Sequence, residues 1–270
     1  MPLPEPTVSE TRVVARNPSS GSENRIHADD VARRHGFRGG LVPGVTVYGY
    51  LAGFLADSLG PDWVGGGRAE VRFRKPCYDG DELTLRLGGP ADDGPVRALE
   101  VRSGDGVAVT GSASLRASPS RPAPIPAAEV RSSAERPLVC RDELEPGTVL
   151  GSIPLDTGPD AAGAYRDRIG TGAGVTADKG WVHPGMLLDA ANWILMAHVV
   201  MPLWLHVGSA IEHRRPLQVG EPVSVRARVA EEWERGGHRF VTLDVSWVGP
   251  DPTDVVATAT HTAIWHLSGT

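Results

Sequence analysis

The sequence predicts an α+β protein made of two copies of one unit, each a long buried helix followed by antiparallel strands. The first observation is an internal repeat: LVPGVTVYGYL at 41–51 is echoed by WVHPGMLLDA at 181–190, with the Pro-Gly pairs 141 residues apart. The second is a later echo, RKPCYDGDE at 74–82 and RRPLQVGEP at 214–222, 140 residues apart. Two matches in the same order at nearly one offset indicate a duplicated domain rather than a solenoid of short repeats.

Length and composition agree with this prediction. The chain has 270 residues, enough for two domains of ordinary size, and its 40% hydrophobic and 22% charged residues are typical of globular proteins. A net charge of −6 argues against a nucleic-acid partner, which requires a basic face. The two cysteines, Cys77 and Cys140, lie far apart without metal-ligand spacing, so we expect reduced thiols, no metal site and no cofactor.

The chain shows no membrane or export signal. The first thirty residues are polar and lack an apolar signal core, which favours a cytoplasmic location. The longest apolar run, 193–207, is interrupted by His198, Pro202 and His206 and is too short to span a bilayer. We therefore expect a core helix there and no membrane partner.

The N-terminal half contains one fully apolar helix. Residues 45–59 are apolar on nearly every face, so other structure must surround this helix. A strand at 11–15 and a short helix at 29–36 precede it; the short helix has Asp at its start and Arg in its last turn. Four strands are expected after it, at 68–74, 82–87, 98–102 and 107–116.

A linker separates this unit from its copy. The segment from Ser118 to Pro137 is rich in Pro, Ala and Ser and has no apolar period. We therefore expect an N-terminal domain at 1–118, a linker at 119–137 and a C-terminal domain at 138–270. In the second domain the expected elements are a helical piece at 165–169, a Gly-rich loop at 170–180, a buried helix at 186–200, and strands at 210–214, 222–233, 239–248 and 255–265.

The segment Gly21-Ser22-Glu23-Asn24-Arg25-Ile26-His27 resembles the hydratase motif of the MaoC-like enoyl-thioester hydratases, Gly-Asp-x-Asn-Pro-hydrophobic-His. Asn24 and His27 match the motif, whereas Ser22 stands at the Asp position and Arg25 at the Pro position. The resemblance implies a tandem (double) hotdog fold, in which each helix is wrapped by a curved sheet. The tandem would then build within one chain the two-fold dimer of single hotdog domains, and a further homodimer remains open.

The resemblance also implies hydration or dehydration of an acyl thioester of coenzyme A or of a carrier protein, a lyase reaction. His27 would act as the base, because imidazole titrates near neutral pH, and Asn24 would hold the substrate or the water. Ser22 could position a water. Glu23 could supply the missing carboxylate if its loop turned inward.

The start of the first buried helix is the expected binding site for the thioester oxygen. The backbone amides of Gly44 and Val45 lack helical partners there, and Gly44 has no Cβ to keep the substrate away. We include Tyr48 on the same helix among the substrate-binding residues.

The second half offers its own candidates in HPGMLLDAAN, namely His183, Gly185, Asp189 and Asn192. The helix start is similar to that of phenylacetate-pathway hotdog thioesterases, which carry an acid nine residues after the His; here Asn192 holds that place. A buried carboxylate such as Asp189 must be paired, so it is either catalytic or bonded across the seam to the other half. His27 could share one pocket with His183 or Asp189.

Three functions therefore remain open: a hydratase led by His27, a thioesterase using His183 or Asp189, and a non-catalytic acyl-binding protein. A cluster of cationic residues, Arg72, Arg74, Lys75, Arg214 and Arg215, either binds the phosphates of the carrier or forms a solvated face.

Overall fold

The computed structural model describes residues 9–90, 94–104, 106–115, 125–170 and 174–268. The elements of the first half are β1 (Ser9–Val14), η1 (Arg25–His27), α1 (Asp29–Arg34), α2 (Gly44–Leu59), α3 (Pro61–Gly66), β2 (Arg68–Phe73), β3 (Glu82–Pro90), β4 (Val96–Ser103) and β5 (Gly106–Ser114). Those of the second half are η2 (Asp142–Leu144), β6 (Ile153–Leu155), α4 (Pro159–Ile169), α5 (Val175–Asp178), α6 (Pro184–His198), β7 (Leu205–His213), β8 (Val223–Arg235), β9 (His238–Val248) and β10 (Val255–His266).

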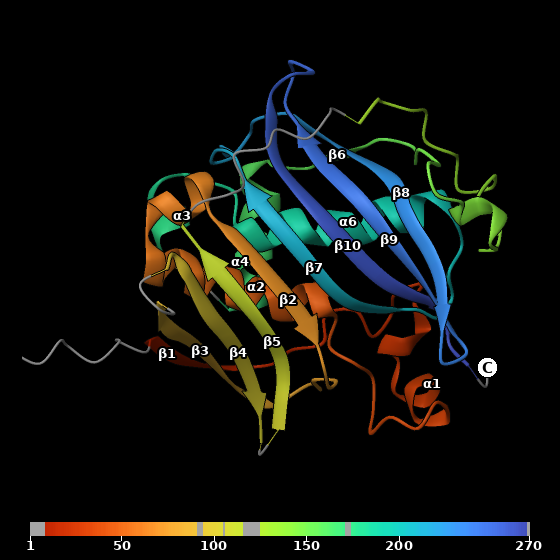
Figure 1. The fold of residues 1–270 in the computed structure, drawn as a ribbon, viewed down its shortest axis with the longest axis horizontal. Coiled ribbons are helices and arrows are strands. Elements are labelled where there is room, and N and C mark those ends of the chain that lie inside the picture. Colours follow the sequence, from red (N-terminus) through yellow and green to blue (C-terminus); the bar gives the residue numbers. More distant parts are fainter. Residues whose placement is uncertain (1–8, 91–93, 105, 116–124, 171–173, 269–270) are drawn as a thin grey trace, which may run out of the picture.

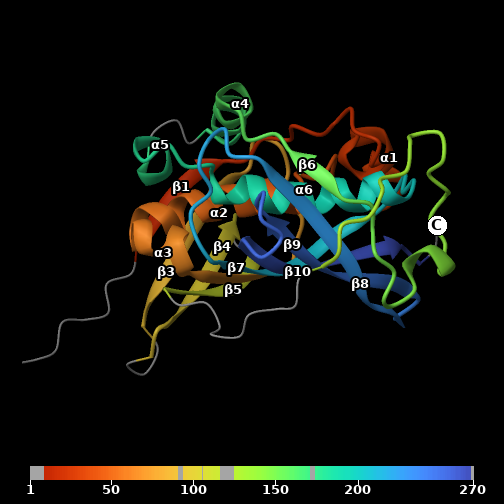
Figure 2. The same cartoon turned by 90° about the horizontal axis from the view of Figure 1, so that it is seen from above.

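All the strands belong to one antiparallel sheet, and α2 and α6 lie side by side on one of its faces (Figures 1 and 2). The strand order is β1-β3-β4-β5-β2-β7-β10-β9-β8-β6, so the second five strands repeat the first five in mirrored order. The two halves join through β2 and β7, whose register pairs Arg68 with Glu212, Glu70 with Ala210 and Arg72 with Gly208. This symmetric register places a local two-fold axis at the pair in the middle, and it confirms the pseudo-dimer within one chain.

The repeated sequence segments have the same local geometry. A β-bridge joins Leu41 to Tyr78, and the equivalent bridge joins Trp181 to Gln218, each residue 140 positions later. Gly80 and Gly220 both adopt positive φ, 80° and 84°, a region that favours glycine. The repeat noticed in the sequence is therefore a duplicated turn that holds the start of each long helix.

The prediction that α2 is apolar on every face because it is enclosed is confirmed. The sheet covers one side, α6 and α4 approach the others, and Leu51 and Leu55 are fully buried. Among the described residues no helix combines the length and the apolar character needed to cross a membrane.

Several elements differ from the expectation. Helix α3 and strand β6 were not predicted, α4 begins at Pro159 rather than at 165, and α5 lies inside the expected Gly-rich loop. The core helix expected at 193–207 is wrong beyond His198, where α6 ends. Strand β7 begins at Leu205 rather than at 210, because pairing with β10 supports residues whose own sequence has no clean alternation.

The described part of the linker, residues 125–137, has no helix or strand but is packed against the second half. Ile125 is buried, and Arg136 bonds both to the Met196 carbonyl and to Glu23. Residues 116–124 lie outside the described ranges, so the domain boundaries at 118 and 138 stay a prediction.

Candidate active site

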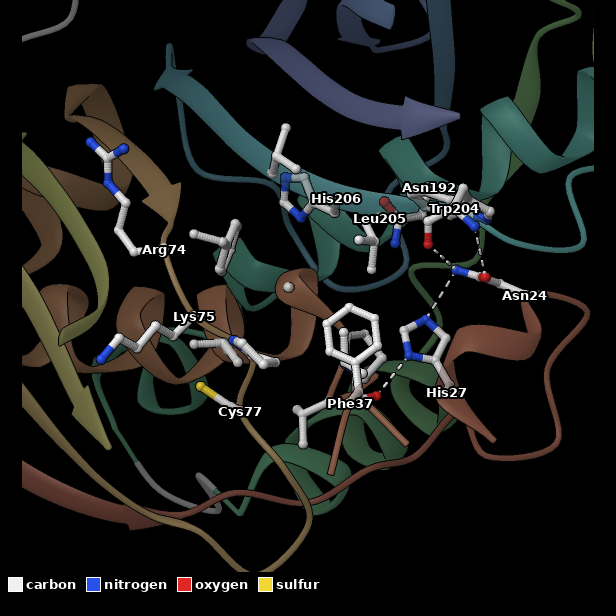
Figure 3. Close-up of a pocket in the computed structure, with 18 residues that line it drawn as sticks. Asn24, His27, Phe37, Arg74, Lys75, Cys77, Asn192, Trp204, Leu205 and His206 are labelled. Atoms are coloured by element: carbon white, nitrogen blue, oxygen red, sulfur yellow. Dashed lines mark hydrogen bonds between the residues drawn. The ribbon is translucent and has the colours of Figure 1, made fainter. Parts of the chain in front are cut away.

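A cavity of about 210 Å³ lies at the seam between the two halves (Figure 3). The first half supplies the segment around η1, the start of α2 and the residues after β2, and the second half supplies one residue of α6 and the start of β7. Its lining is Asn24, His27, Phe37, Leu41, Val42, Pro43, Gly44, Val47, Phe73, Arg74, Lys75, Pro76, Cys77, Asn192, Trp204, Leu205, His206 and Val207. None of these described lining residues carries a carboxylate.

His27 is held in one orientation at the end of η1. Its Nδ1–H donates to the Leu41 carbonyl at 2.7 Å, which leaves the lone pair of the neutral ring on Nε2. Burial lowers the pKa of His27, and the Leu41 carbonyl partly opposes this shift. The ring is therefore neutral near pH 7 and presents Nε2 as an acceptor.

Asn24 ties His27 to the second half. Its Nδ2 donates to the Trp204 carbonyl at 3.0 Å, and its Oδ1 accepts from the Trp204 amide at 3.2 Å. This pairing with the backbone fixes which way the amide points, and the second N–H is then aimed at His27 Nε2, 3.2 Å away. Asn24 also caps η1 by accepting from Ile26 N. It is a positioning residue that crosses the seam.

The start of α2 presents unpaired backbone amides. The amides of Thr46 and Val47 bond to the Pro43 carbonyl, whereas those of Gly44 and Val45 have no partner among the described residues. Gly44 borders the cavity, and Val45 has its side chain in the core. A Cβ at Gly44 would lie 2.7 Å from His206 Nδ1 and 3.1 Å from the Phe73 ring. Glycine is therefore required at this position.

Asn192 of α6 adds a second polar group from the other half. Its side chain is only 8% exposed, it borders the cavity, and its Oδ1 has no hydrogen-bond partner among the described residues. A buried polar atom without a partner carries a free-energy cost that a bound ligand or water would remove.

Two of the five cationic residues expected at the seam border the cavity. In Figure 3, Arg74 and Lys75 lie on the opposite side from Asn24 and His27. Arg74 donates to Thr110 Oγ1 at 3.2 Å, and neither side chain has an ion pair among the described residues. The other three are paired on the surface: Arg72 with Glu70, Arg214 with Glu212, and Arg215 with both Glu221 and Asp254.

Neither a family model nor a curated protein matches this sequence. Solved structures match over nearly the whole chain. They include a MaoC domain protein named as a dehydratase from Chloroflexus aurantiacus, with a TM-score of 0.64 at 13% identity, covering 99% of this chain and 97% of that one. A conserved hypothetical protein from Mycobacterium tuberculosis, described as having a double hotdog fold, gives a TM-score of 0.63 at 16% identity, covering 97% and 96%. This chain is a double hotdog.

The matches also include a protein named as an oleoyl thioesterase from Lactobacillus plantarum, with a TM-score of 0.54 at 11% identity over 97% of this chain and 96% of that one. At such identities the likeness establishes the double hotdog fold, and it confirms the two-unit prediction from the sequence.

Two candidates from the motif segment point away from the cavity of the double hotdog. The Ser22 hydroxyl donates to the Asn24 carbonyl at 3.0 Å, and Ser22 is not among the lining residues. Glu23 is exposed and forms an ion pair with Arg136 of the linker at 3.0 Å. The loop therefore does not turn Glu23 inward, and neither residue replaces the missing Asp at the cavity.

The candidates on α6 do not join His27 either, Asn192 excepted. His183 caps α6 by accepting from the Gly185 amide at 3.1 Å, and burial, assisted by Arg166, lowers its pKa to about 3. Asp189 is buried and paired with Arg168 of α4. Burial raises the pKa of Asp189, and the guanidinium opposes the shift. Arg168 belongs to the same half as Asp189, so the expected bond across the seam is wrong. Neither His183 nor Asp189 borders the cavity, so the expected shared pocket with His27 is wrong as well.

The start of α6 is closed where the start of α2 is open. A Cβ at Gly185 would lie 2.3 Å from the Tyr165 hydroxyl and 2.6 Å from the Gly49 Cα. The Tyr165 hydroxyl of α4 therefore packs directly against the start of α6, and Gly185 does not border the seam cavity that Gly44 borders. Tyr48, another expected substrate contact, is fully buried in the core and does not border the cavity. Gly185 and Tyr48 are thus packing residues.

Sequence reasoning missed Trp204 and His206. Both follow α6 in a run that reads as apolar, and they meet the first half through the β2–β7 pairing and through the bonds of Asn24 to the Trp204 backbone. The one available signal was a histidine interrupting that run. Among the described residues no group of three or more potential metal ligands is present.

Proposed function

We propose that this double hotdog binds an acyl thioester of coenzyme A or of a carrier protein in the seam cavity and adds water to it or removes water from it. The observation that carries the proposal is the single cavity bordered by both His27 and Gly44, whose backbone amide is unpaired. A base and an oxygen-binding site are the two groups that this chemistry requires.

The rest of the lining suits such a substrate. An acyl chain would contact the apolar side chains Phe37, Leu41, Val42, Val47, Phe73, Leu205 and Val207. Arg74 and Lys75, on the side away from His27, would bind the phosphates of coenzyme A or of the carrier arm. The dehydratase and thioesterase names of the similar structures also favour a thioester.

In hydration, His27 Nε2 takes a proton from water while the water oxygen bonds to the β carbon of the enoyl group. The electron pair of the double bond moves towards the thioester oxygen, which the Gly44 and Val45 amides stabilise. The imidazolium then returns its proton to the α carbon, so the elements of water have been added. For this step His27 Nε2 must be free to accept from the water. Asn24 keeps its 3.0 Å hydrogen bond to the Trp204 carbonyl, and the reacting water takes the place of the 3.2 Å hydrogen bond from Asn24 to Nε2.

Thioester hydrolysis is the second candidate, and the lack of a lining carboxylate among the described residues favours it. Hydrolysis needs one base and one oxygen site, because water attacks the carbonyl carbon and no carbon atom has to be protonated. His27 would again be the base, because His183 and Asp189 are buried and neither borders this cavity.

One assay with two readouts tests the proposal. Purified protein is mixed with a panel of enoyl and saturated acyl-coenzyme A thioesters, and enoyl absorbance and free thiol are followed together. Loss of enoyl absorbance without thiol release supports the hydratase, and thiol release supports the thioesterase. Neither signal, with retained binding, leaves only the acyl-binding function.

Substitution of His27 links any activity to this cavity. His27→Ala is expected to lower turnover roughly a hundredfold or more, the usual contribution of one positioned acid–base group. The control is His266→Ala, because His266 is exposed at the end of β10 and away from the cavity. Unchanged turnover in His27→Ala would remove both enzymatic readings based on this residue.

A further inference from the structure

A second imidazole borders the cavity and has no role in the mechanism above. His206, near the start of β7, stacks on His261 of β10 at 4.3 Å between ring centroids, and it makes a tilted contact with the Phe73 ring at 4.7 Å. Its Nδ1 lies against Gly44 and has no hydrogen-bond partner among the described residues. The two halves thus each supply one histidine to the cavity.

His206 is the outer end of a buried chain of hydrogen bonds. Its Nε2 lies 2.8 Å from Ser209 Oγ, and the same oxygen lies 2.9 Å from His261 Nδ1. His261 is fully buried, and its Nε2 also lacks a partner among the described residues. One serine hydroxyl therefore links two rings whose far nitrogens are both unpartnered.

Three proton arrangements satisfy the links of this chain, because a serine oxygen can also accept from both rings. In the first, His261 Nδ1–H donates to Ser209, Ser209 O–H donates to His206 Nε2, and His206 carries its proton on Nδ1. In the second, every donor is reversed, and the unpartnered N–H belongs to His261 Nε2. In the third, both rings donate to Ser209 Oγ, and the Ser209 O–H has no acceptor among the described residues. Each arrangement thus leaves one donor unpaired. His206 lines the cavity whereas Ser209 and His261 do not, so only the first arrangement leaves that donor where a bound ligand can accept from it. The first arrangement is therefore favoured.

Both rings are neutral near pH 7. Burial lowers the pKa of His261 to about 3. Burial and the adjacent His261 lower the pKa of His206 well below its usual value, and the Gly208 carbonyl partly opposes this shift. A neutral imidazole with its proton on Nδ1 is a hydrogen-bond donor that adds no charge to the cavity.

We propose that His206 donates its Nδ1–H to the carbonyl oxygen of the bound acyl thioester, beside the amide of Gly44, and that Ser209 and His261 are positioning residues that fix this tautomer. The inference rests on the proposed function. It places the oxygen site between the halves, with a backbone donor from the first and a side-chain donor from the second. His206 assists hydration and hydrolysis alike, since both develop negative charge on that oxygen.

Four variants test the roles. His206→Phe keeps a flat ring between its neighbours but removes the donor, and is expected to lower kcat roughly 10²–10³-fold with a smaller change in KM. His206→Asn can place an amide N–H near the position of Nδ1, so its kcat is expected to be at least tenfold higher than that of His206→Phe. Ser209→Ala and His261→Phe remove the tautomer control, so their loss is expected to be smaller than that of His206→Phe. Thermal unfolding checks that each variant is folded.

An NMR measurement tests the donor without turnover. In protein labelled with ¹⁵N at histidine, His206 should carry its proton on Nδ1, and Ser209→Ala should mix the tautomers. The probe is the amide analogue of butyryl-coenzyme A, which keeps the carbonyl and resists hydrolysis. Its addition should move the Nδ1–H signal downfield.

The outcomes separate the two proposals. The donor role is overturned if NMR shows no proton on His206 Nδ1, or if folded His206→Phe has a kcat within threefold of wild type. The proposed function still stands in that case, provided the wild-type protein turns over a thioester. A wild-type protein that turns over no thioester, but whose Nδ1–H responds to the analogue, overturns the proposed function and supports the donor role. No turnover and no response overturns both.

Discussion

Gly185 of α6 lies against Gly49 of α2: a Cβ at Gly185 would come within 2.6 Å of the Gly49 Cα. The backbones of the two long helices touch here, and the Tyr165 hydroxyl of α4 lies beside both glycines. This contact sets how closely the two halves of the double hotdog can pack.

Gly185→Ala is accordingly expected to destabilise the protein by about 2–3 kcal/mol, as overpacking of a tight core does. The matched control is Gly163→Ala in α4, where a Cβ would meet nothing within 4 Å and where removing a helical glycine should stabilise by up to about 1 kcal/mol. Urea unfolding of the two variants measures both signs. Equal stability of the two would mean that the helices separate easily at this point.

The buried ion pair on α6 should respond asymmetrically to substitution. Arg168→Met leaves the Asp189 carboxylate without its partner and should lower the free energy of unfolding by about 2–4 kcal/mol, reduced because Arg168 is partly exposed. Asp189→Asn should cost less, because no buried charge remains. Urea unfolding at pH 7 compares them, and a larger loss for Asp189→Asn would contradict this account.

The pH dependence of Arg168→Met gives a further check of that carboxyl. Burial already raises the pKa of Asp189, and loss of the guanidinium raises it more. A folded-state pKa above the unfolded one makes the folded protein bind more protons, so stability relative to wild type should recover as pH falls from 8 to 5. A difference from wild type that stays constant with pH would show that the carboxyl is not the cause.

Buried histidines should make the whole chain sensitive to acid. Burial, assisted by Arg166 for His183, lowers the pKa of His183 and His261 to about 3, and burial lowers that of His213 to about 4. Unfolded histidine titrates near 6.5, so below that pH the unfolded state binds more protons and stability falls, by up to about 1.4 kcal/mol per pH unit for each residue. Urea unfolding at pH 7.5, 6.5 and 5.5 measures the slope.

His213→Gln tests whether buried histidines cause the acid sensitivity. It should lower the slope of the unfolding free energy with pH by the contribution of one histidine, whereas His266→Gln, at an exposed position, should not. A slope unchanged by His213→Gln would assign the acid sensitivity to other groups.

Installing the carboxylate of the MaoC-like hydratase motif with Ser22→Asp should not raise enoyl hydration, if the protein catalyses it as proposed. The Ser22 hydroxyl donates to the Asn24 carbonyl, and a carboxylate there would face that oxygen instead of the cavity. We expect turnover equal to or below that of Ser22→Ala, the matched control, in the enoyl absorbance assay. A tenfold gain in Ser22→Asp would show that the loop can turn its side chain inward.

The sequence carried most of the fold and only part of the site. The Pro-Gly pairs at 43–44 and 184–185 located both helix starts. A crowded helix start requires glycine, and the duplication repeats that glycine and the neighbouring turn at nearly the same spacing, so the sequence shows the repeat directly. The Pro-Gly pattern also led to Gly44, and the resemblance of residues 21–27 to the hydratase motif led to His27; both residues border the cavity.

The rest depended on contacts between distant segments. His206 reaches the cavity because β7 pairs with β2, and no local period encodes that pairing. The partner of Asp189 is Arg168 of α4, which lies in the helical piece predicted at 165–169, but no sequence pattern showed that this helix packs against α6. The direction of Ser22 is decided by a hydrogen bond to a backbone carbonyl two residues away, so residue type alone could not reveal it.

Tyr165 of α4, which packs against the start of α6, illustrates how the two halves of a fused chain can diverge in evolution. In a dimer of identical subunits, any substitution that fills the space at one helix start also fills it at the other, so both openings are lost together. A fused pair escapes that rule, because a tyrosine can enter one copy while the other keeps its opening. Each copy can then diverge separately, so that only one of the two helix starts in the chain has to border a cavity.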